Sequence, residues 1–146
     1  MINIKTLSCT SLSLILMYAC TSGNNGADLQ KEVIGLYASE SENTFDYFKD
    51  TLEIKANQDG KLDVTIIANW SSAKEDDPQR PTNKVAGEWN NHGKGETLVG
   101  ELQASDTTIR IAHPMYNTVD ILKVDLEVGT LEYPTKDGAV VYQKVR

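Results

Sequence analysis

The sequence contains little cysteine, and none in the part that we expect to fold. Both cysteines, Cys9 and Cys20, lie within the first 20 of 146 residues. The chain beyond them can therefore form no disulfide, thiolate nucleophile or cysteine-ligated metal site. Positive charge is also scarce, since 14 Lys and Arg stand against 21 Asp and Glu. No basic cluster offsets this balance, so we expect no nucleic-acid partner.

The sequence also lacks a hydrophobic run long enough to cross a bilayer. Its most apolar stretch, Leu7–Tyr18, is too short for a permanent transmembrane helix but suits the core of a signal peptide. Lys5 supplies the positive charge before this stretch, and Ala19 is the small residue before Cys20. We interpret residues 1–19 as a lipoprotein signal peptide that is cleaved between Ala19 and Cys20. The alternative is an ordinary secretory signal with an incidental cysteine.

Acylation of Cys20 would make the membrane the first partner of the chain, because several acyl chains on one residue hold a protein stably. Thr21, rather than Asp, follows Cys20, which resembles sorting to the outer membrane. No acidic run follows directly, so we expect the periplasmic face. The remainder is expected to comprise a flexible lipidated tether, residues 20–32, and a single β domain, residues 33–146.

Most of the folded part alternates apolar and polar residues with period two, which is typical of half-buried strands. Helical spacing occurs only at Ala27–Val33 and Thr44–Phe48. We predict an all-β fold, a small antiparallel meander of about eight strands that forms a lipocalin-like barrel or a β-sandwich. The expected strands are Val33–Ser39, Thr51–Ala56, Leu62–Trp70, Lys84–Asn90, Thr97–Gln103, Thr107–Ala112, Val119–Val128, Leu131–Tyr133 and Ala139–Val145.

The segment Ser71–Asn83 is the longest polar stretch within the expected domain. Its two prolines and its charges exclude a central strand, so we predict an exposed loop that is dispensable for folding. Long loops without regular structure are often functional. The candidate interaction residues in this loop are Glu75, Asp76, Asp77 and Arg80.

Aromatic residues offer a second candidate site. Alternation places Trp70 on the face of Leu62 and Val64, and we expect it to be mostly buried. Tyr37, Trp70 and Trp89 either line a ligand cavity at a barrel mouth or simply fill the core. Asp50-Thr51-Leu52 and Asp106-Thr107-Thr108 resemble acceptor sequences for O-glycosylation, and ordinary strand starts explain them equally well.

The sequence gives no catalytic or metal-binding pattern. His92 and His113 are the only histidines, and they share no metal-ligand spacing. No serine lies in a nucleophile elbow, and no phosphate-binding glycine loop follows a strand. We therefore expect a protein that is not an enzyme and that carries no metal or cofactor.

Several short motifs resemble a group of small lipoproteins of Bacteroidota, some of which are found with conjugative transposons. The motifs are Gly35-Leu36-Tyr37, Asp50-Thr51-Leu52-Glu53-Ile54, Trp70 and Tyr142-Gln143-Lys144. The resemblance implies a compact all-β lipoprotein domain of unassigned function, without catalytic residues. The loop Ser71–Asn83 is longer than this resemblance leads us to expect.

Two functional hypotheses follow. The first is a non-enzymatic interaction module, anchored to the outer membrane, that binds an envelope protein through its β-surface and acidic loop. The alternative is a lipocalin-like carrier of a small apolar ligand, held beside Trp70 and Trp89.

Overall fold

The computed structural model describes residues 25–136 and 138–146, so the signal peptide and Cys20 lie outside the described residues. The described part contains one helix and nine strands. They are α1 (Asn25–Val33), β1 (Gly35–Glu42), β2 (Asp46–Ala56), β3 (Leu62–Ala73), β4 (Asn90–Asn91), β5 (Thr97–Gln103), β6 (Thr108–His113), β7 (Thr118–Asp125), β8 (Thr130–Thr135) and β9 (Gly138–Lys144). No helix in this part is long and apolar enough to cross a membrane.

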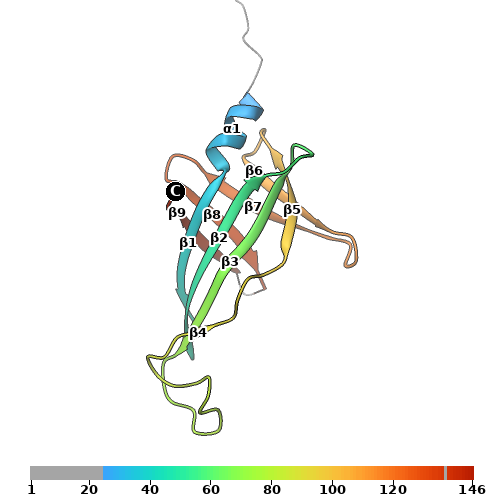
Figure 1. Cartoon of the computed structure of the whole chain (residues 1–146). Coiled ribbons are helices and arrows are strands. Elements are labelled where there is room, and N and C mark those ends of the chain that lie inside the picture. The colour runs from blue at the N-terminus through green and yellow to red at the C-terminus, as the bar shows by residue number, and fades with distance from the viewer. Residues whose placement is uncertain (1–24, 137) are drawn as a thin grey trace, which may run out of the picture.

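Eight of these strands form a closed antiparallel barrel (Figure 1). The order around the barrel is β1, β2, β3, β5, β6, β7, β8 and β9, and β9 pairs back onto β1. The two-residue strand β4 pairs antiparallel with Trp70 and Ser71 near the end of β3. Closure leaves every long strand paired on both sides, which removes exposed edges. The all-β prediction is confirmed, and of its two architectures the barrel is the one that forms.

Helix α1 covers one end of the barrel (Figure 1). Its apolar residues Leu29 and Val33 are four positions apart, so they face the barrel together. Val33 is fully buried, and its carbonyl oxygen accepts a hydrogen bond of 2.6 Å from the hydroxyl of Tyr37. Burial raises the pKa of Tyr37 to about 12. The helix therefore belongs to the folded domain, although the sequence predicts a flexible tether for most of this segment.

The barrel interior is filled mainly by aliphatic side chains. These residues alternate along their strands, as the pleat requires, and side chains from all sides of the barrel meet in one cluster. Its buried members are Val33, Tyr37, Leu52, Ile54, Leu62, Val64, Ile109, Ile111, Leu122, Val124, Leu131 and Tyr142. A β-carbon at Gly100 would lie 2.4 Å from a methyl group of Ile109. Close packing thus requires glycine at this inward position.

A β-bulge in β3 reverses the alternation on which the sequence analysis relied. Leu52 pairs with Ile66 but Thr51 pairs with Ala68, so Ile67 has no partner across β2. Side chains change face at such a bulge. Trp70 pairs with Lys49 on the outer face and is half-buried, whereas Ser71 is buried. The expectation that Trp70 shares the inner face with Leu62 is therefore not met.

Other boundaries also differ from those expected. Strand β2 starts at Asp46, so Thr44–Phe48 is not helical. Strand β3 continues through Ser71 to Ala73, and the exposed loop begins only at Lys74. In the segment Lys84–Asn90 only the final residue belongs to a strand. The early part of β2 escaped detection because its residues do not alternate cleanly between apolar and polar.

Candidate functional site

The turns of the barrel gather at two ends with different properties. The helix end consists of α1 and the turns at residues 57–61, 104–107 and 126–129. The loop end consists of the turns at residues 43–45 and 114–117 and the long segment 74–89. In Figure 1 the long segment extends from the end of the barrel opposite α1. The predicted interaction residues all lie at the loop end.

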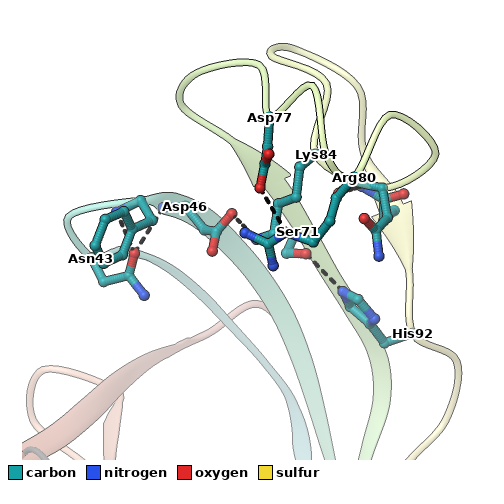
Figure 2. A network of polar contacts seen from close by, with 10 residues as sticks. Asn43, Asp46, Ser71, Asp77, Arg80, Lys84 and His92 are labelled. Atoms are coloured by element: carbon teal, nitrogen blue, oxygen red, sulfur yellow. Dashed lines mark hydrogen bonds and ion pairs between the residues drawn. The ribbon is translucent and has the colours of Figure 1, made fainter.

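The long segment is attached to the barrel by several specific contacts (Figure 2). Lys84 forms an ion pair with Asp46 at the start of β2, and their side chains are only 19% and 13% exposed. Within the segment itself, the amide of Asp77 donates to the carbonyl of Lys84 over 2.8 Å, and the amide of Ala86 donates to the Asp76 carboxylate over 2.8 Å. Ala86 also bridges to Ala73, the last residue of β3. The segment is therefore folded onto the barrel.

A groove of about 650 Å³ separates this segment from the tip of the β1–β2 hairpin. Asn43 shapes the tip, because its side-chain oxygen accepts hydrogen bonds from the amides of Phe45 and Asp46 (Figure 2). The turn leaves Phe45 74% exposed at the groove. The lining residues are Thr44, Phe45, Asp46, Ala73, Lys74, Glu75, Asp76, Asp77, Arg80 and Lys84.

The charges in the groove do not cancel. Asp46 is paired with Lys84, and Asp77 is paired with Arg80 over 2.7 Å. The pKa of Asp77 is lowered, chiefly by the Arg80 hydrogen bond and then by the Gln79 amide.

Lys74 pairs outside the groove with Glu42. Among the described residues, Glu75 and Asp76 make no ion pair, so the groove presents uncompensated negative charge.

The structure brings together the four predicted loop residues, Glu75, Asp76, Asp77 and Arg80, since all line this groove. Sequence reasoning missed Phe45, Asp46 and Lys84. Asp46 and Lys84 are 38 positions apart, and no local pattern links them. The one local sign that Phe45 could be a site residue was its position as an apolar residue between polar residues in a turn.

The predicted aromatic residues do not share one site. Tyr37 is buried in the core below α1. Trp89 lies on the outside of the barrel, 39% exposed, with the Lys49 ammonium 4.9 Å from its ring centre. Trp70 pairs with Lys49 on the same outer face. None of the three lines a cavity in the barrel interior.

The interior becomes polar toward the loop end. Ser39 pairs with Asp50 across β1 and β2, and both lie on the same face as Tyr37 and Leu52. Burial raises the pKa of Asp50, while the Tyr142 hydroxyl, His92 and the backbone of Trp70 oppose this rise. Burial also raises the pKa of Tyr142, and the nearby Asp50 and Tyr133 add to this effect.

A small cavity of about 210 Å³ opens into this part of the interior. Its wall is mostly aliphatic, and Tyr133 is the aromatic residue on it. The lining residues are Leu52, Val64, Ile66, Gly95, Glu96, Leu98 and Tyr133. Sequence reasoning placed Tyr133 in the expected strand Leu131–Tyr133 but did not single it out as a site residue.

Both histidines form polar pairs at the loop end. Nε2 of His92 lies 2.7 Å from the Ser71 hydroxyl, as Figure 2 shows, and Nε2 of His113 lies 3.0 Å from the Asp120 carboxylate. In the described residues His92 has no hydrogen-bonded carboxylate that would orient it as a catalytic base for Ser71. The same residues contain no group of three or more His, Cys, Asp or Glu that could hold a metal ion.

The two candidate glycosylation positions differ in setting. Thr51 is half-buried within β2, in the middle of the barrel wall. Thr107 is half-buried in the turn between β5 and β6 and has a left-handed backbone with φ of 52°. Thr107 therefore lies at the helix end.

No family model, curated protein or solved structure matches this chain.

Proposed function

We propose that the protein is an outer-membrane lipoprotein that binds an envelope protein through the groove at its loop end, without catalysing a reaction. The observation that carries this proposal is the attachment of segment 74–89 to β2 by the Asp46–Lys84 pair. An exposed charged loop with no role would not need a half-buried ion pair to hold it. Attachment gives the groove a fixed shape, and a preorganised surface loses less entropy on binding.

The proposed anchor supports the use of the loop end. Cys20 precedes the first helical residue, Asn25, by five positions, which limits the distance between them to about 18 Å. An anchor there would hold the helix end near the membrane. The loop end lies at the other end of the barrel, across strands such as β3 with 12 residues, about 40 Å of extended chain (Figure 1). A soluble or neighbouring envelope protein would reach that end freely.

The chemistry of the groove defines the partner that we propose. Phe45 offers an exposed aromatic ring, and Glu75 and Asp76 offer negative charge without an ion-pair partner. A protein segment with a basic side chain beside an apolar one complements this surface. Aromatic residues at such positions commonly dominate binding energy.

The alternative, a carrier of an apolar ligand, has less support. Cavities that hold drug-sized ligands usually measure about 300–1,000 Å³. The interior cavity is smaller, about 210 Å³, because side chains such as Leu52 and Tyr133 fill the barrel.

Charge reversal tests the groove. Glu75→Lys and Phe45→Ser should each reduce crosslinking to the partner in membranes by about tenfold, since each removes one feature of the complementary surface. Glu88→Lys makes the same charge change elsewhere on the same loop and should leave crosslinking unchanged. Equal loss in all three variants would point to general electrostatics, and no loss in Glu75→Lys and Phe45→Ser would refute the groove.

The anchor has a separate test. Cys20→Ser should release the protein from the membrane fraction and stop incorporation of labelled fatty acid. Its folding should not change. If wild type and variant fractionate alike and neither takes up label, the lipoprotein assignment fails while the groove proposal stays testable in solution.

A further inference from the structure

Two buried polar atoms in the interior have no hydrogen-bond partner in the described part of the chain. They are Oγ of Ser39 and Oδ1 of Asp50. Ser39 is only 5% exposed, and it lies directly opposite Asp50 in the β1–β2 register. Buried polar atoms are nearly always paired, so two unpaired neighbours call for an explanation. Both can accept a hydrogen bond, and a ligand that donates several would satisfy them together.

The interior cavity lies beside this pair of acceptors. Leu52, the next inward residue of β2 after Asp50, is part of the cavity wall. Tyr142 is near Asp50 and also near Tyr133 on the opposite part of the wall, since both raise its pKa. A carboxylate with one unpaired oxygen therefore lies next to an aliphatic cavity. A ligand with a polar head and a short apolar body would fit such a site.

The surrounding charges favour a cation. The cavity rim carries Glu96, and no lysine or arginine is among the residues that line the cavity. Asp120 adds a third carboxylate near Tyr133, although His113 is paired with it. The imidazole of His92 also lies near Asp50. An anionic ligand would meet only repulsion from Asp50 and Glu96.

We propose that this part of the barrel interior binds a small organic cation, a protonated amine on a compact apolar group. The ammonium group donates hydrogen bonds to Asp50 and Ser39, and the apolar group occupies the space between Leu52, Ile66 and Leu98. The site is separate from the groove at Phe45, so it does not depend on the partner proposed above.

Benzylamine is a suitable probe, and benzyl alcohol and benzoate are its neutral and anionic counterparts. Each is titrated into the full protein while the methyl resonances of Leu52, Ile66 and Leu98 are followed by NMR. Benzylamine should give saturable shifts at these methyl groups. Benzyl alcohol and benzoate should bind at least about tenfold more weakly, because a hydrogen bond to a charged group is lost or reversed.

Two matched variants test the role of the carboxylate. Asp50→Asn keeps the shape of the side chain and should weaken benzylamine at least about tenfold. Asp59→Asn makes the same change in the exposed turn at the helix end and should have no effect. Three results would each overturn the proposal: no saturable shift with benzylamine, equal binding of benzyl alcohol, or full binding by Asp50→Asn. None of these results bears on the groove.

Discussion

The two ends of the barrel place their polar groups differently. At the helix end, α1 covers an aliphatic core, and the buried hydroxyl of Tyr37 is bonded to Val33. Toward the loop end lie three buried side-chain atoms that have no hydrogen-bond partner in the described residues. They belong to Ser39, Asp50 and Ser72. The groove lies at this end too. The helix end satisfies its buried polar groups, whereas the loop end leaves some of them without a partner in the described residues.

This difference has an energetic meaning. An unpaired buried polar group costs about 1–3 kcal/mol, and a typical domain has only about 5–15 kcal/mol of stability. Proteins tolerate such costs where binding or catalysis needs them. The difference between the two ends therefore predicts that substitutions of similar kind change the free energy of unfolding differently at the helix end and at the loop end.

The largest effect on stability is expected at the helix end. Ile109→Ala removes a fully buried side chain and should cost about 2–5 kcal/mol, lowering the melting temperature by about 10 °C. Trp89→Ala removes a larger side chain, but one that lies 39% exposed at the loop end, and should cost less than about 1 kcal/mol. Thermal unfolding followed by circular dichroism measures both. Similar losses of stability in the two variants would contradict the proposed difference between the two ends.

An intermediate effect is expected at the Asp46–Lys84 pair. Lys84→Met leaves Asp46 half-buried without its ion-pair partner and should cost about 1–3 kcal/mol. Amide hydrogen exchange should accelerate in segment 74–89 while α1 stays protected, because only the attachment of the segment is lost. The double variant Asp46→Asn/Lys84→Met should recover part of the stability but not the slow exchange. Unchanged exchange in the segment would mean that other contacts fix the groove.

The smallest effect is expected at Asp50, and its sign is opposite. Burial raises the pKa of Asp50, so between its ordinary value and the raised value the folded chain holds more protons than the unfolded chain. The contribution of Asp50 to stability therefore falls as pH rises through this window. Asp50→Asn should stabilise the protein by about 1 kcal/mol near pH 7.

Urea unfolding at two pH values measures this effect. The advantage of Asp50→Asn should shrink when the pH falls below the ordinary pKa of aspartate, where both side chains are neutral. Because His92 and Tyr142 also face Asp50, His92→Gln serves as the control for their influence. If Asp50→Asn destabilises the protein near pH 7, the carboxylate is a structural group and not a free acceptor.

The sequence predicted the fold where side chains alternate cleanly. The expected strand Val119–Val128 covers all but the first residue of β7, and the turn at Asn57–Gly60 joins β2 and β3 as a hairpin. Alternation failed at the loop end, because the inward residues there are polar. The residues after Ser39 and the start of β2 up to Asp50 gave no clean apolar alternation, so the first strand was predicted to end at Ser39 and the first half of β2 was missed.

The candidate site was only partly accessible from sequence. The loop charges identified one wall of the groove, since solvated charges and prolines mark exposed segments. The other wall, at Phe45 and Asp46, depends on a hairpin tip 38 positions before Lys84. The position of Trp70 depends on the bulge at Ile67, and two consecutive isoleucines were its only sign. Long-range pairing and bulges follow from the assembled barrel, and no local pattern contains them.

Photo-crosslinking from single positions tests the central claim, that the loop end binds and the helix end does not. A photoreactive amino acid is placed at Phe45 or, as the control, at Asp59 in the exposed turn of the helix end. Both proteins are irradiated in membranes of intact cells. We predict a discrete protein adduct from position 45 that Glu75→Lys abolishes, and no such adduct from position 59. Adducts from position 59 alone, or an adduct from position 45 that Glu75→Lys leaves intact, would contradict the claim.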